Sequence, residues 1–152
     1  MRHLMAGLSV LVLIGCEKKD ATPAADTTAM MTPPAATMNL SSMAGRWNVQ
    51  VMPEGRDTVV TTYVLNATAD TAGWTLTFPG REPLPYRILV VSGDSAVSEL
   101  GPYESVLRPG VQATTRSVSR MRGDTMVSTV VVTYASGPDS IVRLTARGTR
   151  AP

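Results

Sequence analysis

Apolar residues alternate with polar ones along several short segments between residues 45 and 152. This period of two places the apolar residues on one face of a β-strand, and no segment shows the period of an amphipathic helix. Residues 57–67 and 86–91 are apolar on both faces, which predicts more deeply buried strands. The four clearest apolar faces are Trp47, Val49 and Val51; Trp74, Leu76 and Phe78; Val130, Val132 and Tyr134; and Val142, Leu144 and Ala146.

Turn signals separate these segments. Each aspartate after residue 45 is followed by a hydroxyl residue, and in three of the five cases a glycine lies just before it. Because such side chains bond nearby backbone groups and glycine adopts positive φ, the pattern predicts hairpin turns. Calcium binding is the alternative, but it needs a denser spacing of oxygen ligands. The five pairs are Asp57-Thr58, Asp70-Thr71, Asp94-Ser95, Asp124-Thr125 and Asp139-Ser140.

The segments between turns number about eight in roughly 108 residues. Regular turn spacing of this kind predicts an all-β domain over residues 45–152, and consecutive hairpins favour a small antiparallel up-and-down meander barrel. A β-sandwich is the alternative. Closing the sheet would also remove its exposed edges, which matters for a valine-rich chain.

The first 15 residues have the pattern of an export signal. Arg2 and His3 precede an apolar run over residues 4–14, which spans roughly 16 Å as a helix and is too short to cross a bilayer. Leu13-Ile14-Gly15-Cys16 resembles the lipobox of bacterial lipoproteins, in which the cysteine is acylated after the signal peptide is removed. The resemblance implies lipidation of Cys16, with palmitate-type chains as the membrane anchor. An ordinary signal peptide is the alternative.

Residues 16–44 are predicted to be a lipidated flexible tether. They are rich in Ala, Thr, Pro and Met and have no sustained period of 2 or 3.6. With few large apolar groups, the segment cannot offset the entropy of ordering. The expected location is therefore the bacterial cell envelope, lipid-anchored and extracytoplasmic, with the choice of inner or outer membrane open.

Composition argues against most catalytic chemistry in the exported chain. His3 would be lost with the signal peptide and the single cysteine would be acylated, so the usual general base, cysteine nucleophiles and the commonest metal sites are excluded. Glu99 and Glu104 are the only close carboxylate pair outside obvious turns. We therefore expect no enzyme, no cofactor and no metal. The 11 arginines and nine carboxylates from residue 45 onward are interspersed, so no nucleic-acid partner is expected.

The predicted first strand opens with Gly45-Arg46-Trp47, which is similar to the Gly-x-Trp start of lipocalins and avidins. The resemblance implies that Trp47 plugs one end of the barrel beneath an arginine of the last strand, with Arg143 or Arg147 as the candidates. The domain departs from lipocalins in its shorter length, its short first loop, the missing second motif and the absence of a helix after the last strand. A core tryptophan in an unrelated β-domain is the alternative.

Two stretches contain candidate ligand-binding residues. In residues 101–110, Gly-Pro and Pro-Gly bound a loop with Tyr103 and Arg108, which could lie at a barrel mouth or be a plain connector. In residues 112–122, Arg116 and Arg120 share one face of a strand that has no apolar face. Facing inward, they would suit an anionic ligand; facing outward, they would protect an exposed strand.

The sequence thus predicts a lipid-anchored, lipocalin-like binding module for a small apolar or anionic ligand. The alternative is an envelope structural or protein-interaction module with a filled core. The sequence does not identify any protein partner.

Overall fold

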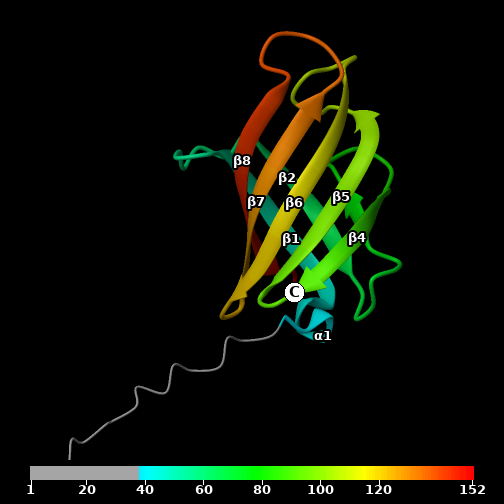
Figure 1. The fold of residues 1–152 in the computed structure, drawn as a ribbon, viewed down its shortest axis with the longest axis vertical. Coiled ribbons are helices and arrows are strands. Elements are labelled where there is room, and N and C mark those ends of the chain that lie inside the picture. The colour runs from blue at the N-terminus through cyan, green and yellow to red at the C-terminus, as the bar shows by residue number, and fades with distance from the viewer. Residues whose placement is uncertain (1–37) are drawn as a thin grey trace, which may run out of the picture. The chain divides into compact units, whose positions relative to one another are not determined.

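A computed structural model describes residues 38–152. The predicted signal peptide, the lipidation site Cys16 and the tether up to residue 37 lie outside the described residues. Figure 1 shows a barrel of long, strongly tilted strands. The elements are α1 (Leu40–Met43), β1 (Gly45–Pro53), β2 (Thr61–Ala67), β3 (Thr75–Thr77), β4 (Leu84–Ser92), β5 (Ser95–Glu104), β6 (Gln112–Arg122), β7 (Thr125–Tyr134) and β8 (Ile141–Arg150).

The eight strands form one closed antiparallel barrel in the order β1 to β8, with β8 paired back onto β1. The predicted all-β, up-and-down meander is therefore confirmed, and the barrel holds rather than the sandwich. Closure pairs Trp47 of β1 with Leu65 of β2 on one side and with Arg150 of β8 on the other.

The barrel core is built by the period-two pattern of the sequence. Along β1 the burial alternates strictly, with Trp47, Val49 and Val51 inside, and along β8 Leu144 and Ala146 are inside. Gly148 continues the inner row of β8, where a Cβ would lie 2.9 Å from Cε of Met126. The interior is thus closely packed at this level.

Two predicted hairpin turns have the backbone geometry that glycine permits. Gly93 joins β4 to β5 with φ 54°, and Gly123 joins β6 to β7 with φ 58°. In both, the aspartate follows the glycine and the hydroxyl residue begins the next strand. The turn interpretation of these pairs is confirmed.

The folded part begins earlier than predicted. Residues 38–44 belong to the predicted tether, yet Met38 and Met43 are buried and α1 lies against one end of the barrel (Figure 1). The side chain of Asn39 caps α1 by accepting a hydrogen bond from the Ser41 amide at 2.9 Å. Apolar side chains at only a few positions are enough to order the segment, because the barrel end provides the surface that buries them.

Residues 57–67 and 86–91, the two runs that are apolar on both faces, are not more deeply buried than the other strands, contrary to the prediction. Val59 and Val60 before β2 and Leu89, Val90 and Val91 in β4 are exposed, with Val90 half accessible to solvent at 50%. A single-layered barrel leaves its outer face in water, whereas a sheet buried on both faces needs a second covering layer. In addition, β3 pairs only with Leu84 and Pro85 of β4, so the rest of β4 has no β3 partner.

Candidate functional site

The barrel interior is nearly filled by side chains. Its central cavity holds only about 40 Å³, far less than the several hundred Å³ of a typical small-molecule site. Aliphatic residues such as Leu144 and Val130 line one part of it, and hydroxyl residues line another. None of the residues that line this cavity carries a formal charge.

Hydroxyl groups of β4, β5 and β6 pair with one another inside the barrel. Ser98 donates a hydrogen bond to the Tyr86 hydroxyl at 2.6 Å, and Tyr103 and Thr115 share one at 3.0 Å. Burial raises the pKa of Tyr86, an effect that its hydrogen bonds with serines partly oppose. This part of the interior is therefore polar but neutral, beside a mainly apolar core.

The loop between β5 and β6 covers one end of the cavity. Its residues Val106 and Leu107 line the cavity, and the Ser105 hydroxyl holds the loop by accepting hydrogen bonds from the amides of Leu107 and Arg108, both at 3.1 Å. Arg81 also binds the loop, donating to the carbonyl groups of Glu104 and Ser105. The loop is thus fixed by polar contacts at its base.

The structure places Tyr103 and Arg108 at this end of the barrel. Tyr103 lines the cavity, whereas the Arg108 guanidinium lies over the Tyr134 ring, 4.0 Å from its centroid, and donates to the Pro138 carbonyl at 2.7 Å. Arg108 therefore ties the β5–β6 loop to the β7–β8 loop. Both alternatives of the sequence apply: the segment is a connector, and it lies at the barrel mouth.

Arg116 and Arg120 lie on the outer face of β6, so of the two orientations left open by the sequence the outward one holds, and these arginines do not line an anionic lumen. The inner face of β6 has Thr115, Ser117 and Ser119, which are buried. A lumen of this size accommodates small hydroxyl residues and excludes guanidinium groups, which need water or a counter-charge. Arg120 instead pairs with Asp94 at 3.1 Å.

The outer arginines are arranged around β7. Arg116 and Arg143 lie in register on either side of Val131, and Arg120 and Arg147 lie on either side of Val127. A shallow hollow of about 620 Å³ lies on this face and includes Arg120, Arg122 and Arg147, with Asp57 at its lining. The charges protect an otherwise valine-rich face.

Trp47 plugs one end of the barrel, but the arginine beside it is neither Arg143 nor Arg147. Trp47 is fully buried, and its indole NH donates to the Met43 carbonyl at 2.7 Å. The guanidinium over its ring is that of Arg150. Arg143 and Arg147 have the opposite parity to Leu144 and Ala146, so they point outward.

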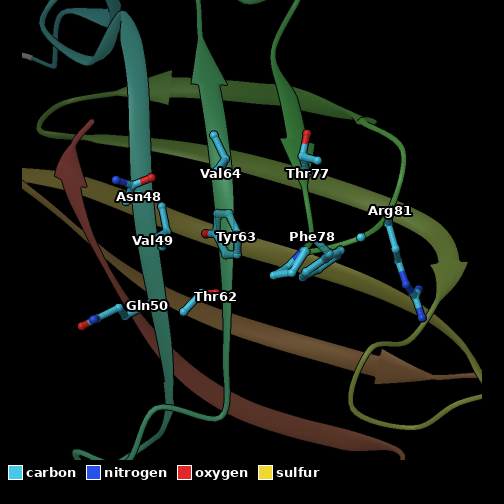
Figure 2. Close-up of a pocket in the computed structure, with 11 residues that line it drawn as sticks. Asn48, Val49, Gln50, Thr62, Tyr63, Val64, Thr77, Phe78 and Arg81 are labelled. Carbon is cyan, nitrogen blue, oxygen red and sulfur yellow. The ribbon is translucent and has the colours of Figure 1, made fainter. Parts of the chain in front are cut away.

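A pocket of about 430 Å³, larger than the central cavity, lies in the barrel wall between β2 and the chain that follows β3 (Figure 2). The pocket exists because β3 ends at Thr77 and the chain then turns away at Pro79-Gly80. As a result, Thr61 to Tyr63 of β2 have no β3 partner among the described residues. Its lining is mainly apolar with a few amide and hydroxyl groups, as is typical of ligand sites. The lining residues are Asn48, Val49, Gln50, Thr62, Tyr63, Val64, Thr77, Phe78, Pro79, Gly80 and Arg81.

Two aromatic residues separate this wall pocket from the central cavity. Tyr63 and Phe78 line both spaces, and their rings meet edge to face with centroids 6.0 Å apart (Figure 2). Phe78 also stacks on Tyr103 at 5.6 Å. Burial, with smaller effects from Tyr86 and Tyr103, raises the pKa of Tyr63 well above its ordinary value.

Sequence reasoning did not find Tyr63, Phe78 or Arg81 as site residues. The available signal was Pro79-Gly80 directly after an alternating segment, since proline and glycine end a strand early and leave a gap in the wall. The gap itself depends on the length of β3, which the alternation does not determine.

A scan against models of known protein families finds no match, and searches of curated proteins and of solved structures find no similar protein. Among residues 38–152, no helix has the length and apolar character needed to cross a membrane.

Proposed function

We propose that this protein is a lipid-anchored, extracytoplasmic and non-catalytic binding module, and that its ligand is a small, mainly apolar molecule held in the wall pocket. The pocket of about 430 Å³ carries the proposal, because it has the volume and apolar lining of a ligand site. The lipobox-like residues ending at Cys16 support the anchor.

The site differs from the one that the lipocalin resemblance implies. In this barrel the central cavity of about 40 Å³ is too small for a drug-sized molecule, whereas the wall pocket is roughly ten times larger. The ligand therefore binds from the side of the barrel, against Tyr63, Val64 and Phe78.

An apolar ligand is favoured over an anionic one. Arg116 and Arg120, the candidates for holding an anion, are on the outer face of β6 and do not line the wall pocket. The single formal charge in the pocket lining is Arg81, whose guanidinium already binds two backbone carbonyl groups. The pocket lining thus offers an anion one guanidinium group, part of whose donors already bind the chain, and no second positive charge.

Two measurements test the ligand site. Mass spectrometry of the native lipid-anchored protein should reveal a co-purifying apolar molecule. Because residues 38–152 form a closed barrel with its own core, the chain from Glu17 onward can also be titrated without lipid, using the apolar fluorescent probe N-phenyl-1-naphthylamine.

Val64→Gln places a polar side chain on the pocket wall and should weaken probe binding about 5- to 10-fold. Val131→Gln is the matched control, since Val131 is likewise half-buried on the outer face but lies on β7, away from this pocket. Equal affinity of the two variants, or no binding to the wild type, would contradict the proposal.

The anchor has its own test. The wild type should incorporate labelled palmitate and remain with membranes, while Cys16→Ala should do neither. A wild-type protein without lipid would refute the anchor and leave the pocket unaffected.

The second candidate function is an envelope interaction module with a filled core. It is favoured by the nearly filled interior and by the exposed apolar residues Leu89 and Val90 on β4. This function predicts that neither a co-purifying molecule nor the probe is bound.

A further inference from the structure

Phe78 is the residue that closes the wall pocket toward the barrel interior. Its side chain is buried, it lines both the wall pocket and the central cavity, and it contacts Tyr63 on one side and Tyr103 on the other. Its ring therefore forms, together with that of Tyr63, the partition between the two spaces.

This partition is made of side chains and not of paired backbone. The β2–β3 ladder includes Val64↔Thr77 but stops there, and the chain then leaves the barrel wall at Phe78 (Figure 2). Where the strands are paired, opening the barrel means breaking strand-to-strand hydrogen bonds. Here a rotation of Phe78 about its side-chain bonds is sufficient, which is a motion of lower energy.

The space behind Phe78 offers hydrogen bonds but no charge. Tyr86, Ser117, Thr115 and Tyr103 line it with hydroxyl groups, and no charged residue lines it. The Tyr63 hydroxyl makes no side-chain hydrogen bond with the described residues and is not fully buried, and Tyr63 lines both spaces. A ligand group that reaches this region can therefore bind Tyr63 directly.

The volume and the lack of charge define the group that fits. A cavity of about 40 Å³ has room for only a few atoms, since about 10–15 Å³ of such space is enough for one water molecule. A phosphate or a sugar is too large, and a carboxylate or an ammonium group would be buried without a counter-charge. A single hydroxyl or carbonyl group meets both conditions.

We propose that Phe78 is a gate between the wall pocket and the interior, and that the ligand is an apolar molecule with one small neutral hydrogen-bonding end, a hydroxyl or a carbonyl. The apolar body lies in the wall pocket while the polar end passes Phe78 and bonds to Tyr63. This inference rests on the proposed function, since it assumes that the wall pocket binds a ligand.

Three ligands with the same chain length test the polar end: 1-decanol, decanoate and decylamine, each used at pH 7.5 to displace N-phenyl-1-naphthylamine. Decanol should displace the probe at a concentration at least about 10-fold lower than either ion. Tyr63→Phe keeps the ring and removes only the hydroxyl group, so it should remove most of this preference by weakening decanol several-fold more than it weakens the probe or decanoate.

Variants at Phe78 test the gate. Phe78→Leu, which shortens the side chain, should speed decanol association several-fold in stopped-flow displacement, and Phe78→Trp should slow it by a similar factor. Circular dichroism and urea unfolding establish that each variant is folded; if Phe78→Trp is not, the Leu variant and Tyr63→Phe still decide the matter.

The outcomes separate the two proposals. One outcome is that Val64→Gln weakens probe binding while decanol and decanoate displace the probe equally well. This result overturns the gate and the neutral ligand but leaves the wall pocket as the site. Equal weakening of all three ligands by Tyr63→Phe also overturns the gate and the neutral ligand. If the wild type binds neither probe nor decanol, both proposals fail.

Discussion

The guanidinium carbon of Arg150 lies 4.5 Å from the centre of the Trp47 ring, at the end of the barrel that α1 closes. The same side chain donates hydrogen bonds to the carbonyl groups of Ala44 at 2.8 Å and Ser42 at 2.7 Å. One arginine of the last strand thus joins the first strand, the short helix and the residue that connects them.

Replacing this arginine should loosen the closed end. Arg150→Ala removes a cation–π contact and two charge-assisted hydrogen bonds, so we expect a loss of about 2–3 kcal/mol in the free energy of unfolding. Arg147→Ala is the control, because Arg147 is exposed on the outer face and its loss should cost about 0.5 kcal/mol or less. Urea unfolding followed by tryptophan fluorescence measures both. Similar losses in the two variants would show that the contacts of Arg150 contribute no more to the free energy of unfolding than an exposed arginine does.

Gly148 should not tolerate a larger residue. A Cβ at this position would lie 2.9 Å from Cε of Met126 and 3.3 Å from Cγ2 of Val49. The end of Met126 can move, but Val49 is held in the ladder, so Gly148→Ala should destabilise the barrel by about 1–3 kcal/mol. Adding Val49→Ala should cost less than simple addition of the two single losses predicts, which a double-mutant cycle in urea would measure. No loss in the single variant would contradict the close packing.

Stability should fall in alkaline solution. Burial raises the pKa of both Tyr63 and Tyr86 above the ordinary tyrosine value of 10.0. Above pH 10 the unfolded chain therefore loses phenolic protons that the folded barrel retains, and this favours unfolding. The contribution is fully present below pH 10 and is lost as the pH rises toward and through the raised values. Urea midpoints measured from pH 8 to 11 should show the fall, and the Tyr63→Phe variant should show less of it.

The exposed valine of β4 should be dispensable for folding. Val90 is 50% exposed on a strand whose outer part has no β3 partner, so Val90→Lys should change the free energy of unfolding by about 0.5 kcal/mol or less. A charge on such an edge opposes strand pairing between molecules, so the variant should remain monomeric at higher concentration in light scattering. Val130→Lys, on the buried face of β7, is the contrasting control and should prevent folding.

The fold was predictable because its signals are local. Alternation of the kind seen at Trp47, Val49 and Val51 sets the inner face of a strand, and Gly-Asp pairs such as Gly93-Asp94 set the turns. The same parity, carried from Leu144 through Ala146, places Arg150 on the inner side, so the sequence also held the information that favours Arg150 over Arg143 and Arg147.

Other features depend on three-dimensional context. Neither face of β6 is apolar, so alternation could not decide whether Arg116 faces in or out; the small size of the lumen decides it. The wall pocket arises where β3 stops after Thr77, and strand length is set by the competition between pairing and the following Pro79-Gly80. The order of residues 38–44 depends on burial against the barrel end, which no local pattern reveals.

The backbone amide of Met38 donates a hydrogen bond to the carbonyl group of Gly93, at the turn between β4 and β5. Gly93 and α1 lie at the end that Trp47 seals, whereas the loop with Val106 and Leu107 lies across the length of β5, at the other end. Anything that holds the chain upstream of Met38 therefore holds the barrel from beneath its plugged end. With the anchor and the ligand site that we propose, the mouth loops would point away from the point of attachment, and a ligand would reach the wall pocket from the side without having to pass beneath the barrel.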